Sequence, residues 1–262
     1  TTPYIKDIIN HTNAKIVYRA HNVEYLIWQR LANSSNFFIS LIYRYLAKKL
    51  MEYEINILNS CNLIITLSNI DKSLYFTHKP NLNYFVNPIG INNCYTNKYN
   101  IINNITSCDY QLSNKIPVKL FYLGSLEWAP NRNGLIWFLK YIFPQLIKKY
   151  NIILKIASFY IPNSIKYYQK KYSNNIILTS TQNALQFMSE NGAMIVPLLS
   201  GSGIKVKILE AMSIGVNVIA SSIAAEGINY TNLKNIIIAD SVNDYFNAIE
   251  IIKDPVNCEN IS

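Results

Sequence analysis

The stretch PLLSGSGIKVKILEAMSIG, from Pro197 to Gly215, decides the fold that we predict for this chain. It follows a solid apolar run, Ala193–Val196, and contains the short loop Gly201-Ser-Gly203. The residues after the loop, Ile204–Ile214, have the pattern of a helix, and Gly215 is suited to end it in the left-handed conformation. A buried strand, a glycine-containing loop and a helix in this order predict one unit of a doubly wound parallel α/β sheet.

The beginning of this helix is a predicted phosphate site. Ligands of such sheets lie beyond the carboxyl ends of the strands, where the free N–H groups of a first helical turn point at them. Lys205 and Lys207 oppose the helix dipole there, which a bound anion would offset. Glu210, about two turns into the helix, could accept hydrogen bonds from ribose hydroxyls. On spacing alone, Lys207 and Glu210 could equally form an ordinary surface pair, with the glycines only shaping a turn.

Strands and helices alternate in the same way through the rest of the chain. After residue 116, apolar runs predict strands at Val118–Leu123, Ile152–Ala157, Asn175–Thr179, Asn217–Ala220 and Ile236–Ala239. Helical patterns lie between them at Asn133–Tyr150, Ser164–Tyr172, Asn183–Glu190 and Asn243–Ile252. Before residue 103, we predict strands at Lys15–Ala20, Leu63–Leu67 and Tyr84–Asn87, and a long helix at Leu41–Asn59. Ser68, three residues before Asp71, is typical of a capped helix start.

The predicted domain organisation turns on a polar segment without apolar periodicity, residues 103–115, which we interpret as a linker. It separates an N-terminal Rossmann-like domain, residues 1–102, from a C-terminal one, residues 116–255, and residues 256–262 form a tail. The chain begins Thr-Thr-Pro-Tyr without a Met and enters a helical pattern at once. We therefore expect further residues before Thr1 and an incomplete N-terminal domain.

The composition indicates a globular protein, since half of the residues are hydrophobic and 15% are charged. The apolar runs are strand-sized and too short to cross a membrane. The cysteines lie far apart without a CxxC pair, which favours free thiols in a reducing cytosol over a metal site. They are Cys61, Cys94, Cys108 and Cys258.

The net charge of +9 comes from 24 basic residues that are scattered along the chain. This scatter argues against nucleic acid as a partner. Peripheral contact with an anionic membrane, or with phosphate-bearing substrates, explains the surplus more simply.

The segment GSGIKVKILEAMSIGVNVIAS, followed by Ala225-Glu-Gly227, resembles the donor-domain signature of family 4 retaining glycosyltransferases of the GT-B fold. Other stretches are similar to the same family in the same order. They are RAHNVE (19–24), TLSNID (66–71), PIG (88–90), LGSLEWAPN (123–131) and IAD (238–240). The resemblance spans about residues 15–255. It implies a donor-binding C-terminal domain and an acceptor-side N-terminal domain.

The resemblance implies a set of donor-binding residues. Glu210 matches the second Glu of the family's Glu-x7-Glu pattern, which binds the ribose, and Lys205 would meet the diphosphate. The backbone of Gly201, Ser202 and Gly203 would cradle the diphosphate, and Gly124 would face the cleft. The first Glu of the pattern falls on Ser202, and Ala157-Ser158 replaces a glycine of the family near the base pocket.

On the acceptor side, the resemblance implies that His21 lies near the transferred sugar and is catalytic together with Lys205. Glu24 lies in the same loop as His21. The residues themselves also allow structural roles. His21 could cap local backbone, Glu24 could begin the following helix, and Asp71 fits a helix cap better than a catalytic acid.

The implied activity is transfer of a sugar, with retention, from a nucleoside-diphosphate sugar to a hydroxyl acceptor of a cell-surface glycan or lipid-linked saccharide. We expect no metal, because no Asp-x-Asp pair is placed to hold one. We expect a cytoplasmic protein at the inner face of the membrane. A sugar-nucleotide epimerase of the same fold and a degenerate nucleotide-sugar-binding module are the alternatives, with a nucleic-acid binder as a further rival.

Overall fold

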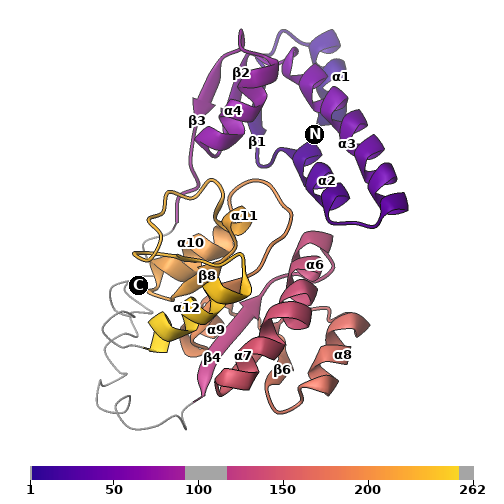
Figure 1. Ribbon diagram of the computed structural model, residues 1–262. Helices are drawn as coiled ribbons and strands as arrows, with labels where there is room; N and C mark the ends of the chain where they lie inside the picture. Colours follow the sequence, from indigo (N-terminus) through magenta and orange to yellow (C-terminus); the bar gives the residue numbers. More distant parts are fainter. Residues whose placement is uncertain (1, 92–116, 254–262) are drawn as a thin grey trace. The chain divides into compact units, whose positions relative to one another are not determined.

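The computed structural model describes residues 2–91 and 117–253, which belong to two compact units (Figure 1). Unit 1 comprises residues 1–90 with the short segments Ser200–Ile204 and Glu226–Ile228, and unit 2 comprises the remainder. The predicted linker 103–115, the tail 256–262 and Cys94, Cys108 and Cys258 lie outside the described residues. The predicted domain bounds, 1–102 and 116–255, remain a prediction.

Unit 1 is built on a three-stranded parallel sheet in the order β1-β2-β3. The strands are β1 (Val17–Ala20), β2 (Leu63–Thr66) and β3 (Tyr84–Val86), and the helices are η1 (Thr2–Tyr4), α1 (Ile5–His11), α2 (Glu24–Asn33), α3 (Phe37–Leu58) and α4 (Asn69–His78). Because the strands are parallel, their carboxyl ends meet at one edge, with Ala20 paired to Thr66 and Thr66 to Val86. Three of the sequence motifs, RAHNVE, TLSNID and PIG, therefore gather at this edge.

Two helix starts in unit 1 follow from side-chain caps. The predicted start at Ser68 is confirmed, since its hydroxyl accepts a hydrogen bond from the backbone N–H of Asp71. The long helix α3 begins at Phe37, four residues before the predicted Leu41. The side chain of Asn36 accepts from the N–H of Ile39 at 3.2 Å and so fixes the earlier start.

Unit 2 is built on a six-stranded parallel sheet in the order β6-β5-β4-β7-β8-β9, which confirms the predicted doubly wound α/β class. The strands are β4 (Val118–Leu123), β5 (Ile152–Ala157), β6 (Ile176–Thr179), β7 (Ala193–Val196), β8 (Val218–Ala220) and β9 (Ile237–Ile238). All four residues of β7 and all three of β8 are buried. Both faces of the sheet are thus covered, which explains why these strands are solid apolar runs.

The helices of unit 2 are α6 (Ala129–Trp137), η3 (Phe138–Ile142), α7 (Phe143–Lys149), α8 (Asn163–Lys171), α9 (Ala184–Glu190), α10 (Val206–Ser213), α11 (Ser222–Ala225) and α12 (Val242–Lys253). The segment predicted as a helix, Asn133–Tyr150, is helical as far as Lys149, but the helix begins earlier, at Ala129, and a π-helical stretch divides it into α6 and α7. Pro144 has no N–H for the carbonyl of Lys140 and crowds it. The chain widens before it into a π-helical stretch, η3, in which the N–H of Phe143 bonds to the carbonyl of Phe138.

The predicted end of the helix in the fold-deciding stretch is confirmed. Gly215 has a φ of +74°, the left-handed conformation expected of a helix-ending glycine. The N–H of Val216 donates to the carbonyl of Ala211 at 3.0 Å, and the N–H of Gly215 donates to the carbonyl of Met212 at 3.1 Å. In the described part of the chain, no helix combines the length and the apolar character that a membrane crossing requires.

Candidate functional site

In the sheet of unit 2, the order in which successive strands are added reverses between β4 and β7. From β4 the chain adds β5 and β6 on one side, and β7, β8 and β9 then extend the sheet on the other side. At such a switch point the helices that follow the two central strands diverge, and a crevice opens at the carboxyl ends of the strands. Gly124 follows β4 at this edge, and α10 is the helix that follows β7.

Lys207, in the first turn of α10, lies at this switch point. Its ammonium group donates a hydrogen bond to the carbonyl oxygen of Leu123 at 3.0 Å and lies 5.0 Å from the centre of the Tyr122 ring. Burial, together with the charge of Lys205, lowers the pKa of Lys207 to about 8. Ion pairs among the described residues join other side chains, so the alternative of a Lys207–Glu210 surface pair is wrong.

Gly124 allows this close approach between strand and lysine. A Cβ atom there would lie 3.0 Å from the Lys207 nitrogen, 3.1 Å from the Tyr122 hydroxyl and 3.3 Å from the Asn131 side-chain nitrogen. The Tyr122 hydroxyl is buried and has no hydrogen-bond partner in the described part of the chain. A buried polar atom of this kind, beside a lysine and a bare glycine, indicates a place for a polar ligand group.

The N-terminus of α10 has the electrostatics of an anion site. Lys205 is the N-cap residue and supplies no side-chain acceptor for the first-turn N–H groups. The helix begins at Val206, two residues after the predicted Ile204, because Gly203 has a φ of +70° and Lys205 is still extended. Glu210 is half-buried, and its burial raises the pKa of its carboxyl group. Uncapped N–H groups and two lysines together favour negative charge.

A pocket of about 240 Å³ adjoins Gly124. It is lined by the carboxyl ends of β4, β5 and β6, through Leu123, Gly124, Ser125, Glu127, Ala157, Ser158, Phe159 and Thr181. The hydroxyl of Ser158 stiffens its wall, because it accepts from the N–H of Leu126 at 3.3 Å and donates to the carbonyl of Tyr160 at 2.9 Å. The pair Ala157-Ser158, where the family usually has a glycine, thus lies in the pocket wall.

In unit 1, the RAHNVE motif runs from β1 into α2. The His21 side chain is exposed just past the carboxyl end of β1. Glu24 is the first residue of α2, and its carboxylate accepts from the Asn22 side chain at 3.1 Å. The backbone N–H groups of Glu24 and Tyr25 donate to the buried carboxylate of Glu54 at 3.1 and 3.4 Å. Glu54 therefore caps α2 from within the core.

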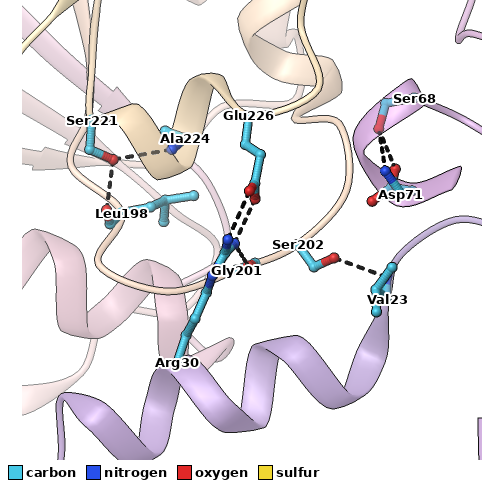
Figure 2. Close-up of polar contacts among 10 residues, drawn as sticks. All are labelled: Val23, Arg30, Ser68, Asp71, Leu198, Gly201, Ser202, Ser221, Ala224 and Glu226. Atoms are coloured by element: carbon cyan, nitrogen blue, oxygen red, sulfur yellow. Dashed lines mark hydrogen bonds and ion pairs between the residues drawn. The ribbon is translucent and has the colours of Figure 1, made fainter. Parts of the chain in front are cut away.

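The glycine loop 201–203 also belongs to unit 1 and is held by α2 and the residue before it (Figure 2). Arg30 donates to the carbonyl of Gly201 at 2.5 Å and pairs with both carboxylate oxygens of Glu226, at 2.6 and 2.8 Å. The hydroxyl of Ser202 is buried and accepts from the N–H of Val23 at 2.9 Å. This bidentate Arg30–Glu226 pair fixes the loop and gives a structural role to the Ala225-Glu-Gly227 motif.

Replacement of Gly203 by alanine is expected to distort this loop. Gly203 has a φ of +70°, and an added Cβ would collide with the carbonyl oxygen of His21 and the side chain of Asn22. The combined strain should lower the free energy of unfolding by about 2 kcal/mol. Chemical denaturation should show this loss, whereas Gly90→Ala, which has open space around it, should be nearly neutral. If Gly203→Ala and Gly90→Ala changed the free energy of unfolding equally, the proposed strain at Gly203 would be contradicted.

The predicted site residues fall into two groups. Gly124, Lys205 and Glu210 are in unit 2, and His21, Glu24 and Gly201–Gly203 are in unit 1. The cap of α4 is Ser68, and Asp71 is the third residue of the helix. The Asp71 carboxylate accepts a hydrogen bond from the Ser68 hydroxyl at 2.8 Å and so supports the capping residue (Figure 2). Nowhere in residues 2–91 and 117–253 do three or more His, Cys, Asp or Glu side chains group as a metal site would need.

Several important contacts of the site were not predicted from the sequence. Lys207 was predicted as added positive charge or as a surface partner of Glu210, and not as a residue bonded to the end of β4, although a lysine at a position facing the sheet was a usable signal. Tyr122 and Arg30 gave no signal, because their importance depends on partners that lie far along the chain. The same holds for Glu54, which looks like any other acidic residue of a long helix.

Comparison with known proteins bears on these observations. Residues 117–253, just over half of the chain, match the model of a protein family described as glycosyl transferases group 1. A Klebsiella pneumoniae protein, described as an uncharacterized 44.6 kDa protein in the cps region, is 27% identical over 233 residues. That alignment covers 85% of this chain and 55% of the Klebsiella protein, so the chain spans about half the length of this curated relative.

Solved structures show the same GT-B fold at low sequence identity. TarM of S. aureus, solved as a mutant with Fondaparinux, alpha-GlcNAc-glycerol and UDP, superposes with a TM-score of 0.67 at 14% identity. The match covers 99% of this chain and 48% of TarM. WaaG, a glycosyltransferase involved in lipopolysaccharide biosynthesis, superposes with a TM-score of 0.62 at 15% identity, covering 97% of this chain and 72% of WaaG.

Proposed function

This chain belongs to the group 1 glycosyltransferases, and on that premise we propose that it binds a nucleoside-diphosphate sugar at the switch point of unit 2. The observation that supports this proposal most directly is the position of Lys207. Its ammonium group is fixed against the end of β4, beside a bare glycine and at the uncapped start of α10. These groups together offer a pyrophosphate two cations and the N–H groups at the start of the helix, although the N–H of Ile208 already bonds to the carbonyl of Lys205 at 2.9 Å.

The rest of the nucleotide fits the neighbouring features. We propose that Glu210 accepts hydrogen bonds from the ribose hydroxyls, as the family resemblance implies. The pocket of about 240 Å³ beside Gly124 would hold the base. The unpartnered Tyr122 hydroxyl would then find a partner in the ligand or in a water molecule bound with it.

The proposed reaction transfers the sugar to a hydroxyl group with retention of configuration. Departure of the nucleoside diphosphate concentrates negative charge on the pyrophosphate. Lys205, Lys207 and the first turn of α10 are fixed in advance and would stabilise that charge electrostatically. The proposal calls on no metal ion for this task. By the resemblance, His21 acts near the transferred sugar and Glu24 on the acceptor side.

The acceptor class is proposed from the relatives. The Klebsiella protein is encoded in a cps region, and WaaG acts in lipopolysaccharide biosynthesis. We therefore propose a cell-surface glycan or a lipid-linked saccharide as the acceptor, and action in the cytoplasm at the inner face of the membrane. The net charge of +9 favours such a location.

Calorimetric titration with UDP and GDP tests the donor site. Lys207→Gln removes the cation that lies at the switch point. The affinity of this variant for the preferred nucleotide should be about thirtyfold lower than that of the unsubstituted chain. Lys166→Gln is a matched control, because it removes one charge from an exposed position on α8 of the same unit. Glu210→Ala should also weaken nucleotide binding if the carboxylate holds the ribose.

Equal nucleotide affinity in the Lys207→Gln and Lys166→Gln variants would contradict the proposed donor site. A parallel titration with a single-stranded oligonucleotide separates the rival class. Steep salt dependence without nucleotide preference would favour nucleic-acid binding. Product analysis with a labelled sugar nucleotide then separates a transferase from an epimerase and from a module that only binds.

A further inference from the structure

The N-terminal part of α3 presents an apolar face that nothing in the described chain covers. Phe37 is 72% exposed, Phe38 79% and Tyr45 62%, and Leu41 and Ile42 are more than half exposed. Large apolar side chains are rarely this exposed in adjacent helical turns. This face has no role in the proposed donor site.

The apolar face lies on the side of α3 that points away from the rest of unit 1. Phe38, Leu41, Ile42 and Tyr45 recur at three- and four-residue spacing and so share one side of the helix. Ala47, on the opposite side, is buried, and α3 packs against α2 (Figure 1). Phe38 and Ala47 are nine residues apart, about two and a half turns, so the exposed apolar stripe is opposite the packed side.

The charged residues within this part of the helix are basic. Residues 37–49 contain Arg44, Lys48 and Lys49, all exposed, and no acidic residue. The nearest acid is Glu52, which pairs with Lys49 at 3.2 Å. An apolar and aromatic stripe bordered by basic residues is complementary to an anionic lipid surface, where aromatic rings enter the headgroup layer and cations meet phosphates.

We propose that the N-terminal half of α3, residues 37–49, docks unit 1 onto an anionic membrane. The helix lies in the plane of the interface, with Phe37, Phe38, Leu41 and Ile42 inserted between the headgroups and Lys48 and Lys49 at the phosphates. The inference is independent of nucleotide binding. It names the surface by which this chain meets a membrane.

Vesicle flotation with the 262-residue chain tests the proposal. The probes are phosphatidylcholine vesicles with and without phosphatidylglycerol, at low and high salt. We expect binding to the anionic vesicles that weakens as salt screens the charges. Phe37→Ser/Phe38→Ser should reduce the partition coefficient at least about tenfold, because two inserted rings are lost. Lys48→Gln/Lys49→Gln should reduce it about tenfold on anionic vesicles alone.

Matched variants in unit 2 separate this surface from general stickiness. Tyr160→Ser/Tyr167→Ser removes two exposed aromatic rings, and Lys170→Gln/Lys171→Gln removes two adjacent charges on α8. Neither should change vesicle binding. Equal losses in these controls, or full binding by both α3 variants, would overturn the proposal. A different pair of results would also overturn it. The unsubstituted chain would bind neither type of vesicle, and it would self-associate in sedimentation velocity in a way that Phe37→Ser/Phe38→Ser abolishes. Thermal melting of each variant shows that it is folded.

Discussion

Replacement of Gly134 by alanine is expected to destabilise unit 2 by about 2 to 3 kcal/mol. In an ordinary helix the same change would be favourable by up to about 1 kcal/mol. Here the added Cβ would be driven into the carbonyl group of Pro197, and it would also lie 3.2 Å from the Cα of Leu198. Both neighbouring groups are backbone atoms, so rotation of a side chain cannot relieve the clash.

Urea denaturation followed by tryptophan fluorescence measures this effect, because Trp137 lies in the same helix, α6. Gly90→Ala serves as the control, since a Cβ at Gly90 would meet nothing within 4 Å. The Gly134 variant should also bind nucleotide less well, because Pro197 and Leu198 begin the segment that leads from β7 to α10. A stability equal to or above that of the unsubstituted chain would show that α6 can move away from this segment.

Gly134 also illustrates what the sequence can and cannot predict. Strands of unit 2 such as Val118–Leu123, Ile152–Ala157 and Ala193–Val196 agree to the residue with the predictions, because strands covered on both faces are mostly apolar and therefore form recognisable runs in the sequence. The helix interruption before Pro144 was missed, since a proline is compatible with several local solutions. The close approach of Gly134 to Pro197 depends on tertiary packing between distant segments.

The candidate site divides in the same way. The glycine loop, Lys205 and Glu210 could be named from one contiguous motif, whose order follows from the strand–loop–helix geometry. Lys207 acquires its importance from the carbonyl of Leu123, which lies far away in the sequence. Arg30 likewise depends on Glu226. Such pairs leave no periodic pattern in one sequence, so only the folded chain shows them.

The stability of unit 1 is expected to fall as the pH rises from about 5 to about 8. Burial, partly opposed by the hydrogen bonds from Tyr25 and Glu24, raises the pKa of Glu54 to about 7 from 4.5. The folded state therefore holds this proton more tightly than the unfolded state does. The stabilising contribution is fully present below about pH 4.5 and is lost as the pH rises through about 7. Its size is roughly 3 kcal/mol, at about 1.4 kcal/mol for each pKa unit.

A unit-specific probe makes this prediction measurable. Trp28 lies in α2 of unit 1, whereas Trp128 and Trp137 lie in unit 2, so replacing the latter two by phenylalanine leaves fluorescence from unit 1 alone. Glu54→Gln keeps an acceptor for the backbone N–H groups of α2 but cannot ionise, and urea midpoints should then lose most of their decline between pH 5 and 8. Glu52→Gln, on the exposed side of α3, should keep the decline. A decline of the same size in both variants would mean that Glu54 is ionised in the folded protein, with water or the N-terminus of α2 compensating its charge.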